Sequence, residues 1–179
     1  MAANRAGVLI VCAVFVGIMG FLHIVRQDLS PLVRGISRYA GSDTLALATV
    51  AFLALAGATA ALASFLHQAQ AIRLVLLAAG GLVVVAATPI GEFRNPAVTA
   101  LHTFGGLAFY LGAVGAMFSS PSSVGDRVLS CMAAVVLSLF FGGAIGLPGL
   151  RLVVGLLQRG VFTLIIVWML KLAVQQTAG

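Results

Sequence analysis

The side chains able to do chemistry are few in this chain, and they stand inside or at the ends of apolar runs. His102 lies several residues into one apolar run, and Arg159 directly precedes another. An imidazole can act as a general base or a metal ligand, and a guanidinium group binds anions. Asp28 and Glu92 supply carboxylates that would assist His102. The sequence thus holds groups for acid–base chemistry or for anion recognition.

No sharper catalytic motif accompanies these groups. The chain has no pair of histidines four residues apart, the spacing with which a helix grips zinc. A site of His23 and His102 completed by an acidic residue stays open, but no metal or other cofactor is expected. Ser30 and Ser37 are candidate nucleophiles with His102 as base, although neither serine lies in a nucleophile motif. Because the chain has no glycine-rich phosphate loop, ATP-driven work is not expected.

Composition decides the environment in which these groups must lie. Of the 179 residues, 61% are hydrophobic and 8% are charged, and the mean hydropathy is +1.17. A soluble domain has about 25% charged residues because water must cover its surface. This chain has too little charge for that, so we predict an integral membrane protein in contact with membrane lipids. Its arginines are scattered singly at the ends of apolar runs, so nucleic acid is not an expected partner.

Six apolar runs are long enough to cross a bilayer. A spanning helix needs about 20 mostly apolar residues. The runs are continuously apolar rather than alternating, which argues against barrel strands. We therefore predict an all-α fold in which residues 1–179 form a single six-helix transmembrane domain. The predicted spans are about 7–25, 44–66, 72–90, 97–118, 127–147 and 157–175.

Six spans divide the connections between the two sides of the membrane. The first, third and fifth connections share one side, and both termini share the other. Most polar residues fall on the first side, which includes the segment 26–43, RQDLSPLVRGISRYAGSD. Polar groups below the headgroups are costly unless they face a partner or a wet cavity, so we predict a one-sided polar pocket. The alternative is that each group lies at headgroup level or makes a structural ion pair. The predicted ligand-binding residues are Arg26, Asp28, Arg34, Ser37, Glu92, His102 and Arg159.

A stripe of small residues marks the fifth span. Ser130, Ala134, Ser138, Gly142 and Gly146 recur every four residues. Helices in lipid associate through close backbone packing at such residues. We interpret the stripe as packing inside one bundle. A contact with a second copy or with another membrane protein is the alternative.

Three stretches of the chain resemble one known family. The segment DLSPLVRGISRYAG is similar to the Pro-x-x-x-x-Ile-Ser segment of the bacterial and archaeal family called domain of unknown function 998. ALHTFGGLAFYLGAV resembles the Leu-His-Gly opening of its fourth span, and GLLQRGVFTLIIVWMLKLA resembles its closing Gly-Leu-x-x-Arg…Trp span. The resemblance implies that Ser37, His102, Arg159 and Trp168 are the residues that the family pattern picks out in this chain. The family often has Phe-Pro-x-Asp where this chain has TPIGEFRNP, so Glu92 is only a candidate replacement for that acid.

The predicted pocket suggests that the chain binds a lipid headgroup or another small amphiphile. Arg26, Arg34 and Arg159 would recognise an anion, Asp28 and Ser37 would fix the loop, and His102 would form the floor. A lipid-modifying hydrolase or transferase using His102, and a structural or accessory subunit, are the alternatives.

We expect a multi-pass protein of the plasma membrane. The resemblance implies cytoplasmic termini, whereas six of the ten Lys and Arg residues lie on the other side. By the positive-inside rule this count argues for the opposite orientation. Arg151 and Arg159 can belong to an interfacial or buried segment rather than to a loop, and without them the two sides have equal counts. We therefore follow the resemblance and predict cytoplasmic termini.

Overall fold

The computed structural model describes residues 2–41, 43–90 and 95–175, and these ranges contain helices but no strand. All six long helices have the length and apolar composition needed to cross a membrane. The predicted all-α, six-span membrane fold is therefore confirmed. The long helices are α1 (Ala2–Val25), α2 (Leu45–Ala61), α3 (Ala69–Ala87), α4 (Pro96–Ser119), α5 (Val124–Ala144) and α6 (Val154–Gln175), and the short 3₁₀ helices are η1 (Ile36–Tyr39), η2 (Leu62–Phe65) and η3 (Leu150–Val153).

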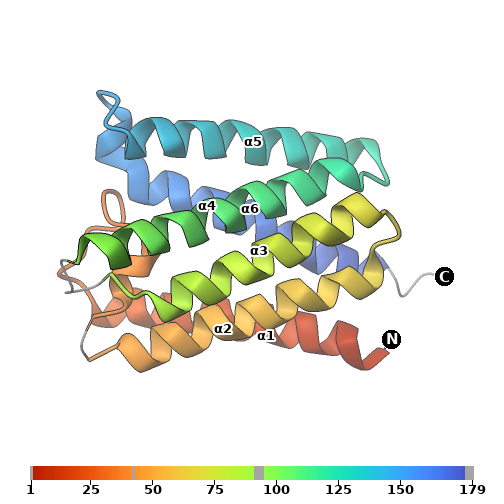
Figure 1. Ribbon diagram of the computed structural model, residues 1–179, viewed down its shortest axis with the longest axis horizontal. Helices are drawn as coiled ribbons and strands as arrows, with labels where there is room; N and C mark the ends of the chain where they lie inside the picture. The colour runs from red at the N-terminus through yellow and green to blue at the C-terminus, as the bar shows by residue number, and fades with distance from the viewer. Residues whose placement is uncertain (1, 42, 91–94, 176–179) are drawn as a thin grey trace.

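The long helices run along a common axis, and consecutive helices are antiparallel (Figure 1). The start of α1 and the end of α6 lie at one end of the bundle, together with the connections α2–α3 and α4–α5. The α1–α2 and α5–α6 connections lie at the opposite end. This arrangement agrees with the division of the loops expected from six spans. The end that holds the segment 26–43 is called the loop end below.

Close contact between α3 and α4 depends on glycine. A Cβ on Gly81 would lie 2.5 Å from the Gly105 carbonyl oxygen, and one on Gly112 would lie 2.6 Å from the Leu74 carbonyl oxygen. Real Cβ atoms do not approach other atoms so closely, so only glycine lets these two backbones touch. Gly80 and Gly106, by contrast, have no atom within 4 Å of the corresponding position. Small residues therefore set the α3–α4 distance, as expected for helices in lipid.

The small-residue stripe on α5 is divided between the interior and the surface. Ser130 and Gly142 are buried, Ala134 is half-buried and Ser138 is exposed. Gly146 was expected in the same stripe, but it lies beyond the end of α5 at Ala144 and has a positive φ of 94°. A Cβ on Gly142 would lie 3.0 Å from a methyl carbon of Leu147, so this glycine packs against its own chain. Part of the stripe thus serves packing inside the bundle. A contact with a second copy or another protein stays a prediction.

A polar cluster ties α5 to α6 at the end opposite the loop end. Asp126 forms an ion pair with Lys171 and accepts a hydrogen bond from the Ser122 hydroxyl at 2.6 Å. Ser123 caps α5 by accepting a hydrogen bond from the Asp126 backbone N–H at 3.2 Å. The cluster satisfies the first backbone donors of α5 and neutralises a buried carboxylate. Its contacts are those of a structural clamp.

Candidate functional site

Arg159 fastens the segment 31–39 to the first turns of α6. Its Nη1 carries two N–H groups and lies within hydrogen-bond distance of three carbonyl oxygens, those of Pro31 at 2.6 Å, Arg34 at 2.9 Å and Gly155 at 2.9 Å. The Gly155 N–H donates to the Leu32 carbonyl at 2.7 Å. A Cβ on Gly155 would lie 2.5 Å from the Arg34 oxygen, so the segment can approach α6 this closely only over a glycine. We call the segment 31–39 the roof segment.

Tyr39 anchors the end of the roof segment between α1 and α6. The Arg159 Nη2 donates to the Tyr39 hydroxyl at 2.6 Å, and His23 Nδ1 lies 2.8 Å from the same hydroxyl. A guanidinium group can only donate. Tyr39 therefore accepts from Arg159 and can donate its own proton to His23. The Tyr39 side chain is 1% exposed, so this network fixes the roof segment against both helices.

A second arginine lies in an ion pair at the end of α1. Arg26 Nε and Nη2 each donate to a carboxylate oxygen of Asp28 at 2.9 Å, which is a bidentate pair. The hydrogen bond from Arg26 lowers the pKa of Asp28 below its ordinary value, because it stabilises the ionised carboxylate. Both residues are thus engaged with each other near the loop end. The side chain of Arg34 is exposed.

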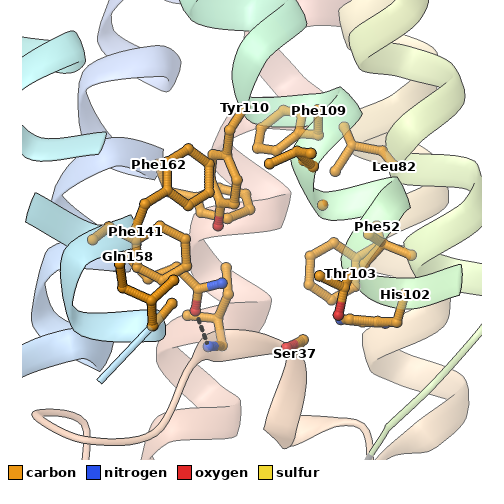
Figure 2. Close-up of a pocket in the computed structure, with 17 residues that line it drawn as sticks. Ser37, Phe52, Leu82, His102, Thr103, Phe109, Tyr110, Phe141, Gln158 and Phe162 are labelled. Atoms are coloured by element: carbon orange, nitrogen blue, oxygen red, sulfur yellow. Dashed lines mark hydrogen bonds between the residues drawn. The ribbon is translucent and has the colours of Figure 1, made fainter. Parts of the chain in front are cut away.

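A cavity of about 450 Å³ opens under the roof segment, between α2, α3 and α4 on one side and α5 and α6 on the other. This volume lies within the range of about 300–1,000 Å³ that is typical of small-molecule sites. Figure 2 shows His102 and Thr103 facing Phe141 and Gln158 across the cavity, with Ser37 at the roof segment. The polar side chains lie near the roof segment together with Phe52 and Phe141, and Phe109, Tyr110 and Phe162 form the deeper walls. The aromatic lining consists of Phe52, Phe109, Tyr110, Phe140, Phe141 and Phe162.

Gln158 has a fixed orientation in this cavity. Its Oε1 accepts a hydrogen bond from the Ile36 backbone N–H at 2.9 Å. Because a backbone N–H can only donate, the other end of the amide must be the NH₂ group. That nitrogen points toward the interior of the cavity (Figure 2). The roof segment therefore sets Gln158 as a hydrogen-bond donor to whatever occupies the cavity.

His102 has a fixed tautomer for a similar reason. Its Nδ1 lies 2.7 Å from the Thr88 carbonyl oxygen, so Nδ1 holds the proton. Nε2 of the neutral ring is then the basic nitrogen and an acceptor. The residue is 9% exposed and lines the cavity. Such a nitrogen can receive a hydrogen bond or act as a base.

The structure brings together only part of the predicted site. Ser37 and His102 line the cavity, whereas Arg26, Asp28, Arg34 and Arg159 are not among its lining residues. Arg26 pairs with Asp28, and Arg159 fastens the roof segment. Glu92 lies outside the described residues. Among those described, no group of three or more His, Cys, Asp or Glu residues is arranged to hold a metal ion.

Sequence reasoning missed Gln158, Tyr110 and the aromatic walls. A signal for them was present in the helical spacing. His102, Gly106 and Tyr110 recur every four residues on α4, and Gln158 stands four residues before Phe162 on α6. Residues at this spacing share one helix face. The cavity is lined by one such face of α4 and one of α6. Each face has a polar residue near the loop end and an aromatic residue further in.

Comparison of the chain with models of protein families, with curated proteins and with solved structures finds no match. The resemblance to domain of unknown function 998 therefore stays a prediction.

Proposed function

We propose that this multi-pass membrane protein binds a lipid or another small amphiphile in the cavity beneath the roof segment. The observation behind the proposal is the uneven lining of the cavity: polar side chains near the roof segment and aromatic side chains further in. An amphiphile has the matching division, with a polar group at one end and hydrocarbon at the other. The hydrocarbon would lie against Phe109 and Phe162, and the polar group would lie near Ser37 and Gln158.

The polar end of the cavity would decide which molecule is retained. Lipid tails are as apolar as leucine side chains, so moving a tail from the bilayer into an apolar cavity gains little hydrophobic free energy. The difference in affinity between one amphiphile and another must therefore come from hydrogen bonds to the polar group, which are stronger where water is scarce. Ser37, His102, Thr103 and Gln158 line this end of the cavity and can make them.

Two of the three arginines that were expected to bind an anion already have partners within the protein. Arg26 is occupied by Asp28, and Arg159 donates to three carbonyl oxygens and to Tyr39. Arg159 would therefore act on binding by holding the roof segment, and through it Gln158, in place. Of the three arginines predicted to bind an anion, only Arg34 is exposed and able to contact a lipid headgroup at the membrane surface.

A matched pair of glycine variants tests the proposal. Gly106 borders the cavity, and a Cβ there would meet no atom within 4 Å. Gly106→Phe should therefore fill the cavity without breaking the helix, since Gly is the poorer helix former. Gly80→Phe is the control, because Gly80 is equally uncrowded but lies outside the cavity lining. Native mass spectrometry of gently extracted protein should show a bound amphiphile in the wild type and in Gly80→Phe, and none in Gly106→Phe. Equal retention by both variants, or a bare wild type, would contradict the proposal.

A catalytic role is a second candidate, because Ser37 and His102 line the same cavity and the His102 Nε2 is the basic nitrogen. The protein would then be a lipid-modifying hydrolase with Ser37 as nucleophile and His102 as general base. A fluorophosphonate probe should label the wild type and not Ser37→Ala. Absence of labelling in both would leave binding as the function.

We also propose a plasma-membrane location with cytoplasmic termini, which would place the loop end outside the cytoplasm. Ser30 and Ser122 are exposed and lie on opposite sides of the bilayer in the six-span fold. A membrane-impermeant thiol reagent applied to whole cells should therefore modify Ser30→Cys and spare Ser122→Cys. The reverse pattern would invert the orientation.

A further inference from the structure

We propose that the cavity selects an uncharged polar group that both accepts and donates hydrogen bonds, such as the glycerol hydroxyls of a monoacylglycerol. This inference rests on the proposed function and specifies the chemical class of the occupant.

The donor on the α6 side is the amide nitrogen of Gln158. Its partner Oε1 is held by the Ile36 N–H, so the amide cannot present an acceptor to the cavity without losing that bond. The amide has two N–H groups. One can serve the Tyr110 hydroxyl, which lies beside the amide, and the other remains for an occupant. An occupant must therefore offer an acceptor oxygen on this side.

The acceptors lie on the opposite wall, on α4. His102 Nε2 is an acceptor because Nδ1 donates to the Thr88 carbonyl. The Thr103 hydroxyl donates its proton to the Thr99 carbonyl at 2.8 Å, so only its oxygen lone pairs face an occupant. Both polar groups of this wall can therefore accept a hydrogen bond from an occupant. A ligand that has only acceptors, such as an ether or an ester without a hydroxyl, satisfies Gln158 but leaves this wall unpaired.

Charge on the occupant is disfavoured by the same lining. Among the described residues, the cavity lining contains no Lys, Arg, Asp or Glu. A buried charge without a partner of opposite sign is costly, whereas a hydroxyl group can be fully satisfied by hydrogen bonds. The site therefore discriminates against alkyl phosphates and against quaternary ammonium amphiphiles.

The open side of the cavity points to membrane lipid as the source of the occupant. The lining includes Leu107 of α4, which is 37% exposed, and Ile145 just after α5, which is 80% exposed. Toward the loop end, by contrast, the buried Ile36 and the half-buried Ser37 cover the cavity. An amphiphile dissolved in the bilayer can thus enter sideways between α4 and α5.

Changes made to the ligand test the inference without altering the protein. Purified wild type is titrated with monomyristoylglycerol, with its dimethyl ether and with myristyl phosphate, and binding is measured by native mass spectrometry. The monoacylglycerol should bind at least about tenfold more tightly than either analogue, because each analogue leaves a polar group or a charge unpaired. Equal or tighter binding of the ether or of the phosphate would overturn this inference and leave the proposed function standing.

Variants of the protein show where the ligand binds. They also separate failure of this inference from failure of the proposed function. Gln158→Leu should weaken monomyristoylglycerol binding by about tenfold, whereas Gln70→Leu, an exposed glutamine on α3, should leave it unchanged. Equal binding by both glutamine variants would remove the donor role of Gln158 and overturn the inference. If no probe binds, this inference fails, and the proposed function is decided by retention of the endogenous amphiphile. If Gly106→Phe binds monomyristoylglycerol as well as the wild type, the cavity is not the site and both proposals fail.

Discussion

Replacing Arg159 with Met should free the roof segment from α6 while leaving the six helices in place. The guanidinium group makes three hydrogen bonds to the segment, to the Pro31 and Arg34 carbonyl oxygens and to the Tyr39 hydroxyl, at 2.6–2.9 Å. Methionine has a similar length but no donor. The three acceptors would lose their partner together.

The expected loss follows from the number and exposure of these bonds. A hydrogen bond to a charged group contributes about 1.5–3 kcal/mol, and three at the lower end amount to about 4.5 kcal/mol. Arg159 is half-buried, so solvent screening reduces the sum to about 3 kcal/mol. Because every 1.4 kcal/mol is tenfold, local opening of the roof segment should become about a hundredfold more frequent.

Hydrogen exchange measured by mass spectrometry reads this opening directly. The amides of Ile36 and Gly155 are protected by contacts between the roof segment and α6. Their exchange should accelerate in Arg159→Met, while amides in the middle of α3 and α4 should not change. Arg73→Met, at an exposed arginine on α3, is the control and should alter exchange by less than about threefold. Equal behaviour of the two variants would show that Arg159 does not hold the segment.

Three further results are expected. Gly112→Leu should prevent α3 and α4 from packing and abolish a monodisperse peak in size-exclusion chromatography, whereas Gly80→Leu should keep it. Gly155→Ala should separate α6 from the segment that lies on it and lower the melting temperature, and an unchanged value would contradict the contact. Arg26→Gln should raise the pKa of Asp28 in a carboxyl NMR titration. Because the folded-state pKa is the lower one, the ion pair stabilises the fold at neutral pH, and this contribution is lost as the pH falls through that pKa.

The helices were predictable because each is a continuous apolar run of membrane-spanning length, a property of local sequence. Their ends were less so. The third span was expected to reach residue 90, but α3 ends at Ala87, two residues before Pro89. The residue before a proline is disfavoured in the helical conformation, which accounts for the early end. The last span was expected to start at 157, but α6 begins at Val154, directly after η3.

The candidate site was predictable only where a polar residue interrupts an apolar run. His102 stands out in this way and does line the cavity. Gln158 does not stand out, because it is neutral and lies next to Arg159. Its role depends on the Ile36 N–H, 122 residues earlier in the chain. Two of the three backbone carbonyl groups that accept from Arg159, those of Pro31 and Arg34, belong to the same distant segment. No local sequence pattern predicts such contacts.

The most direct measurement is an experimental structure of the protein extracted with its surrounding lipid and without detergent. We predict density for a single amphiphile in the cavity, with its polar end within hydrogen-bond distance of the Gln158 amide and of His102 Nε2, and its chain along Phe109 and Phe162. A cavity filled by the protein's own side chains, or density for a headgroup on the exposed Arg34 with none beneath the roof segment, would contradict the binding function proposed here.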